Sequence, residues 1–118
     1  MTSKELEERL INFAVLIIKI ADKLNGHSGT IISNQIIRSG TSPALNYGEA
    51  QSAESSNDFV HKCQIVLKEL RETFVSLKII KKADLYKNRN ELEDALKENN
   101  ELISIFVATV NKLKQNKI

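Results

Sequence analysis

Apolar and polar positions along this chain repeat with the 3.6-residue period of an α-helix, and the period recurs in four separate segments. It predicts helices at about residues 3–24, 30–55, 58–82 and 90–114. No segment of useful length shows the two-residue period of a strand. Four amphipathic helices joined by short connections predict an all-α fold: an antiparallel up-and-down four-helix bundle built as one domain, residues 1–118.

The first predicted helix carries two apolar rows instead of one. One row includes Leu6, Leu10 and Phe13, and a second row beside it consists of Ile11, Val15 and Ile18. So broad an apolar surface exceeds what one stripe in a small bundle requires, and we expect one row to meet another subunit.

Pro43 lies inside the second predicted helix, where it removes the N–H that would bond the Ser39 carbonyl. Either the helix breaks, with Ser42 as N-cap and Pro43 at the first position, or one kinked helix continues. Helical periodicity on both sides favours the kink, with the hydroxyls of Ser39, Thr41 and Ser42 near the freed carbonyl. The two glycines in residues 25–29 are expected to separate the first two helices.

Composition supports a helical, globular protein, with 42% hydrophobic, 27% charged and only 5% aromatic residues. A single cysteine, Cys63, excludes an internal disulfide and fits a reducing compartment, so we expect a cytoplasmic protein. The apolar run at residues 13–18 is interrupted by Lys19 and Asp22 and is too short to span a bilayer, so we expect no membrane association.

The net charge is only +2, but the basic residues concentrate in residues 56–89. In an up-and-down bundle, the turn after the first helix and the linker after the third lie at the same end. That end would gather Lys23, His27, Lys78, Lys81, Lys82, Lys87 and Arg89. Such a basic end favours contacts with RNA or DNA phosphates, multiplied if copies form a ring. The alternative is that these lysines complement helix dipoles and keep the surface soluble.

Base-specific recognition has no support, because exposed aromatic residues are scarce apart from Tyr86 and Tyr47. A protein partner is therefore the competing possibility, with the chain acting as a structural oligomer.

Residues 36–73 combine small residues with polar residues at helical spacing. The run RSGTSPALNYGEAQSAESSNDFVHKCQIVLKELRET resembles the 23S ribosomal RNA intervening-sequence protein family, also called the four-helix bundle protein family. The matching positions are Arg38, Ser39, Ser42, Asn46, Glu49, Ser55, Phe59, Lys62, Lys68, Glu69, Glu72 and Thr73. Pro43 departs from the pattern, because the family usually has an aliphatic residue there.

The resemblance implies a bacterial four-helix bundle that assembles as a homopentamer, and it implies no particular biochemical role. The chain is also similar in fold to the accessory protein of diversity-generating retroelements, a pentameric bundle that binds nucleic acid.

Six polar residues of the middle segment fall within a turn or two of a common face on two helices: Arg38, Asn46 and Glu49 on the second, and Lys62, Glu69 and Glu72 on the third. They form either a binding surface or a network within or between subunits. We favour the network, in which Arg38 pairs with Glu69 or Glu72 and fixes helix register and oligomer geometry.

Catalytic and metal-binding patterns are weak. Asp58 and His61 are the only acid-x-x-His pair, whereas di-metal bundles need more such ligands. Cys63 lies on the apolar face of its helix and is expected to be a buried thiol. We therefore expect no enzyme activity, metal, cofactor or small-molecule substrate, and the expected partners are other copies of the chain and RNA or DNA.

Overall fold

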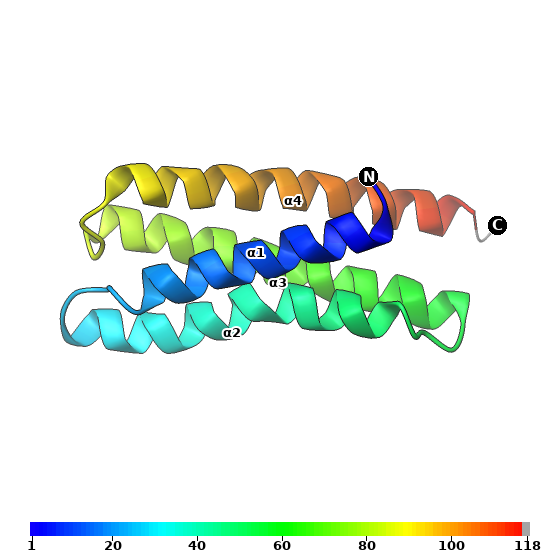
Figure 1. The fold of residues 1–118 in the computed structure, drawn as a ribbon, viewed down its shortest axis with the longest axis horizontal. Coiled ribbons are helices and arrows are strands. Elements are labelled where there is room, and N and C mark those ends of the chain that lie inside the picture. The colour runs from blue at the N-terminus through cyan, green and yellow to red at the C-terminus, as the bar shows by residue number, and fades with distance from the viewer. Residues whose placement is uncertain (117–118) are drawn as a thin grey trace.

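The computed structural model of the chain, described for residues 1–116, contains four α-helices and no strand among those residues. They are α1 (Ser3–Ala21), α2 (Gly26–Ala50), α3 (Ser56–Lys82) and α4 (Arg89–Gln115). The helices run alternately up and down in a rod of 49 × 22 × 21 Å (Figure 1). The predicted all-α helical bundle is confirmed.

Each helix packs on its sequence neighbours, and α1 closes the bundle against α4 through a much smaller contact than the other three. The two diagonal pairs make no close backbone contact, and their side chains meet in the core. One side of every helix therefore faces a shared core, which contains Leu10, Phe13, Ile17, Ile20, Ile36, Cys63, Val66, Leu70, Leu77, Ile80, Leu92, Ala95, Leu102 and Phe106. Burial of these side chains is the main favourable contribution to the fold.

The first connection differs from the prediction. α1 ends at Ala21 rather than near residue 24, and α2 begins at Gly26 rather than near residue 30. Gly26 opens α2 with a φ of +73°, a left-handed conformation that glycine adopts without strain. Gly29 lies within α2, where an added Cβ would come within 2.9 Å of the Leu24 carbonyl carbon. The glycines thus allow the tight turn and close packing, and the break itself is residues 22–25.

The second connection also comes earlier than predicted, because α2 ends at Ala50 rather than near residue 55. The amides of Gln51, Ser52 and Ala53 each bond to the carbonyl three residues before, which tightens the last turn. The Ser55 hydroxyl then accepts a bond from the Asp58 amide at 3.1 Å and starts α3.

Pro43 lies buried within an uninterrupted α2, so the alternative of a helix break is wrong. The Thr41 hydroxyl donates to the Ile37 carbonyl at 2.7 Å, earlier in the helix than the carbonyl that Pro43 leaves free. On the other side, the Asn46 side-chain amide donates to the Ser42 carbonyl at 3.0 Å and to its hydroxyl at 2.8 Å. Side-chain hydrogen bonds therefore flank the proline.

A small polar layer crosses the middle of the core. The hydroxyls of Ser39 and Thr73 are 2.9 Å apart, and Thr73 also donates to the Glu69 carbonyl at 2.8 Å. The Asn99 side-chain nitrogen donates to the Leu70 carbonyl at 3.0 Å, while its Oδ1 is buried with no hydrogen-bond partner among the described residues. This layer joins α2, α3 and α4 and favours one helix register.

Candidate nucleic-acid interface

One end of the bundle is formed by residues 22–25, the start of α2, residues 83–88 and the start of α4 (Figure 1, left). The Asn25 amide donates to the Leu85 carbonyl at 2.9 Å, so the two connections are tied together. Tyr86 folds back onto the bundle and is only 3% exposed. Its hydroxyl donates to Glu91 at 2.8 Å, and burial, together with this carboxylate, raises the pKa of Tyr86 to about 12. The backbone at this end of the bundle is therefore held by packing and hydrogen bonds, which fixes the positions from which its basic side chains extend.

Two of the predicted basic residues lie at the tip of this end. Lys23 and Lys87 line a cavity of about 140 Å³ together with Tyr86, Asn88 and Glu91. Asn88 is the N-cap of α4, and its side-chain oxygen accepts a bond from the Glu91 amide at 3.0 Å. Lys23 and Lys87 therefore lie beside the capped N-terminus of α4.

Three more predicted residues line a larger hollow on the flank, between the end of α3 and the first half of α4. This hollow, the α3–α4 groove, has a volume of about 470 Å³, and its lining consists of Phe74, Lys78, Lys81, Lys82, Glu93, Leu96, Lys97 and Asn100. The Lys78 ammonium lies 4.9 Å from the centre of the Phe74 ring. Lys81 forms an ion pair with Glu93 at 2.5 Å. The groove thus has an apolar base and a mostly cationic rim.

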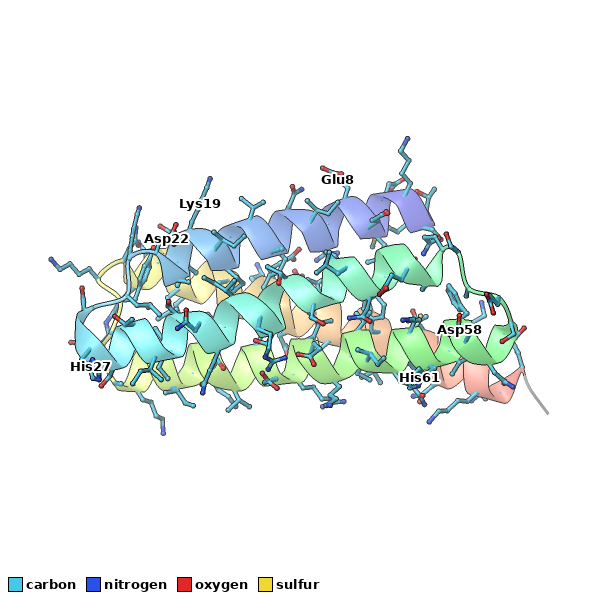
Figure 2. All side chains as sticks on the ribbon, turned by 90° about the horizontal axis from the view of Figure 1, so that it is seen from below. Glu8, Lys19, Asp22, His27, Asp58 and His61 are labelled. Carbon is cyan, nitrogen blue, oxygen red and sulfur yellow. The ribbon has the colours of Figure 1, made fainter. Side chains whose placement is uncertain are left out.

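Five of the seven predicted basic residues therefore fall into two groups at one end of the molecule: two at the tip and three in the α3–α4 groove. The remaining two are His27, at the start of α2 (Figure 2), and Arg89, which pairs with Asp84 at 3.7 Å. Lys97 joins the basic residues although the sequence pattern did not single it out. It lies one turn after Glu93 on α4, so an antiparallel pairing of α3 and α4 would have placed it beside the end of α3.

The expected scarcity of exposed aromatic residues is confirmed, but the two exceptions named with it are not exposed. Tyr86 and Tyr47 are both buried, and Tyr47 packs edge-on against Phe106 with ring centres 5.5 Å apart. The aromatic residue that reaches the basic surface is Phe74, which the helical period placed on the core face. It is half-buried at the margin of the apolar stripe.

The predicted polar network between α2 and α3 consists of separate contacts. Arg38 Nη1 lies 3.0 Å from Glu69, and Arg38 Nη2 bonds to Glu72. Further along, Lys62 approaches Glu49 at 3.6 Å. Asn46 bonds within α2 instead. All three ion pairs join α2 to α3, and a role for them in oligomer geometry stays a prediction.

A stronger interhelix contact was missed by the sequence pattern. Arg9 of α1 makes two 2.7 Å hydrogen bonds to Glu98 of α4 and lies 3.2 Å from Glu101. The hydrogen bond to Glu98 raises the pKa of Arg9. This two-pronged ion pair bridges α1 and α4, where the bundle has its smallest helix contact.

Candidate catalytic groups do not come together in the described residues. Figure 2 shows His27 and His61 at opposite ends of the bundle. No cluster of three or more His, Cys, Asp or Glu side chains suited to a metal ion occurs within residues 1–116. Cys63 is fully buried, and burial raises its pKa to about 11, so the thiol is protonated at neutral pH.

The second apolar row of α1 is exposed in the single chain. Ile11, Val15 and Ile18 are 42%, 43% and 38% exposed, and Leu45 of α2 is 67% exposed. Ile11 and Leu45 line a shallow groove between α1 and α2. These four residues form the α1–α2 apolar face. Within the described residues, no helix has an apolar stretch long enough to cross a bilayer.

Comparison with known proteins gives a family and a fold. The family model described as 23S rRNA-intervening sequence protein matches residues 4–108. A crystal structure of a protein with unknown function from the S23 ribosomal protein family of Bacteroides thetaiotaomicron VPI-5482 is 30% identical, with a TM-score of 0.84. The alignment covers 94% of this chain and 99% of that chain. None of the curated proteins matches this sequence.

Proposed function

The chain belongs to the 23S rRNA-intervening sequence protein family, and we propose that it is a non-enzymatic, self-assembling bundle that binds RNA or DNA through its basic end, without sequence specificity.

The observation that carries this proposal is a set of exposed lysines at one end that form no ion pair with any residue from 1 to 116. They are Lys23, Lys78, Lys82, Lys87 and Lys97. These ammonium groups can contact phosphates without first breaking an ion pair, and such contacts release counterions whatever the base sequence. Lys81 and Arg89 are weaker candidates, because a carboxylate already pairs with each of them.

The buried thiol and the separated histidines support a non-enzymatic role. A nucleophile needs a nearby base or a lowered pKa, whereas Cys63 has a raised pKa and no solvent access. Neither histidine has a metal-binding cluster around it among the described residues.

The α1–α2 apolar face supports self-assembly. Three of its residues follow each other at steps of four and three on α1, which is the spacing that helix-to-helix packing uses. The resemblance to the family suggests five copies. A Val15→Lys substitution should lower the mass measured by light scattering, since it places a charge in the middle of the row; an unchanged mass would contradict this assignment.

The same face favours a second candidate function, a structural oligomer whose partner is another protein. The two functions differ in their response to salt. Labelled RNA and DNA of several sequences should bind with similar affinities, and log K should fall with log salt at about −0.7 per phosphate contact for single strands and −0.9 for duplexes. If no nucleic acid binds at low salt, nucleic-acid binding is ruled out and the structural oligomer is the remaining candidate function.

A further inference from the structure

The α3–α4 groove combines two features that are separate elsewhere on the basic end. Its base is formed by Phe74 and Leu96, which are half-buried, and its rim carries Lys78, Lys81 and Lys82 from α3 and Lys97 from α4. The carboxylate in this lining, Glu93, is already paired with Lys81. A ligand that fits the whole groove must offer negative charge and a flat apolar body together.

Three classes of anionic partner can be compared with this shape. A duplex presents phosphates but keeps its bases stacked inside, so it would leave Phe74 and Leu96 uncovered. An acidic amphipathic helix needs apolar contacts along two or more turns, whereas the base of this groove offers two side chains. A single strand presents phosphates and an unpaired base side by side, and a volume of about 470 Å³ lies within the range of small-ligand pockets.

We propose that the α3–α4 groove is a subsite for one unpaired nucleobase of single-stranded RNA or DNA, which stacks on Phe74 while its flanking phosphates contact Lys78, Lys82 and Lys97. The inference rests on the proposed function and makes it more specific, because it predicts a preference for single strands over duplexes.

Stacking requires the Lys78 ammonium to move off the Phe74 ring, where it lies 4.9 Å from the ring centre. An exposed cation–π contact of this kind strengthens an equilibrium by about 2- to 5-fold. Stacking of a base on an aromatic side chain strengthens binding by about 5- to 150-fold. The exchange therefore favours the base, and the released Lys78 becomes available to a phosphate.

The test compares three probes of equal length: a single strand of mixed bases, a strand of the same backbone without bases, and a duplex. The wild-type protein should bind the strand with bases several-fold to about 75-fold more tightly than the baseless strand, because the lost cation–π contact offsets part of the stacking gain. Phe74→Leu, which keeps an apolar side chain but removes the ring, should abolish that difference and leave the affinity for the baseless strand unchanged. Phe59→Leu is the matched control, since Phe59 is a half-buried phenylalanine at the opposite end of α3.

A 2-aminopurine base in the strand gives an independent readout, because its fluorescence should fall when it stacks on Phe74 and should not fall with Phe74→Leu. If the wild-type protein and Phe74→Leu each bind all three probes equally, the groove assignment is overturned and the proposed function stays intact. Failure of every probe to bind at low salt would overturn the proposed function itself. Displacement of the strand by an acidic amphipathic peptide, with no preference for bases, would assign the groove to a protein partner and overturn the inference.

Discussion

Removal of Arg38 should destabilise the protein more than removal of any other cation between α2 and α3. Its partner Glu69 is only 10% exposed, whereas Arg38 itself is 57% exposed. Loss of the arginine would leave a nearly buried carboxylate without a counter-charge. Exposed pairs contribute about 0.2–1 kcal/mol, and breaking a buried pair costs about 3–5 kcal/mol. The Arg38–Glu69 pair is intermediate in burial, because one partner is exposed and the other is nearly buried. Arg38→Ala should therefore cost about 1–3 kcal/mol of unfolding free energy.

Lys62→Ala is the matched comparison, because Lys62 also joins α2 to α3. Its pair with Glu49 is longer, at 3.6 Å, and the Glu49 side chain is 62% exposed. We expect a cost below about 0.5 kcal/mol. Urea unfolding measures both values, and it should be repeated at two protein concentrations because the proposed self-assembly would add a mass-action contribution to stability.

A second substitution separates the lost charge from the lost side-chain contacts. Glu69→Gln in the Arg38→Ala background should recover about half of the lost stability, since a neutral amide needs no counter-charge. Equal costs for Arg38→Ala and Lys62→Ala, or no recovery with Glu69→Gln, would refute the reasoning. Light scattering of Arg38→Ala tests the related prediction that this pair also fixes oligomer geometry.

Three other predictions concern the core. Gly40→Ala should destabilise by about 1–3 kcal/mol in thermal unfolding, because a Cβ there would come within 2.6 Å of Ile17; a cost near zero would contradict the close α1–α2 packing. Asn99→Leu should raise the unfolding free energy by about 1 kcal/mol, since it removes a buried acceptor that lacks a partner; a large loss would mean that Oδ1 is satisfied. Cys63 should resist alkylation in the folded protein. Its pKa is raised from 9.0 to about 11 by burial, so the stability that the protonated thiol contributes is complete below about pH 9 and is lost as the pH rises towards 11. Urea midpoints across that range, compared with those of Cys63→Ala, check this loss.

The helical period was enough to predict four helices and most of the core, because residues such as Leu10, Val66 and Leu70 repeat on one side of long segments. The helix ends were harder. Gly29 allows close contact with Leu24, and that contact depends on how the chain turns. From the sequence alone, such a glycine is indistinguishable from one that ends a helix.

The basic end followed from topology, because an up-and-down bundle must place residues near 23, 82 and 87 together. The α3–α4 groove could not be predicted in the same way. It depends on how α3 and α4 are rotated about their axes, which decides whether Phe74 enters the core and whether Lys97 faces α3. Tyr86 is buried because residues 83–88 fold back onto the bundle.

The most direct test of the basic end is the salt dependence of nucleic-acid binding in two double variants with the same change in net charge. Lys78→Glu with Lys82→Glu alters the α3–α4 groove, and Lys112→Glu with Lys114→Glu alters the last turn of α4 at the other end. The first pair should weaken binding and reduce the slope of log K against log salt by about 1.4 for single strands or 1.8 for duplexes. The second pair should leave the slope close to the wild-type value. Equal slopes for the two variants would contradict the assignment of nucleic-acid binding to this end.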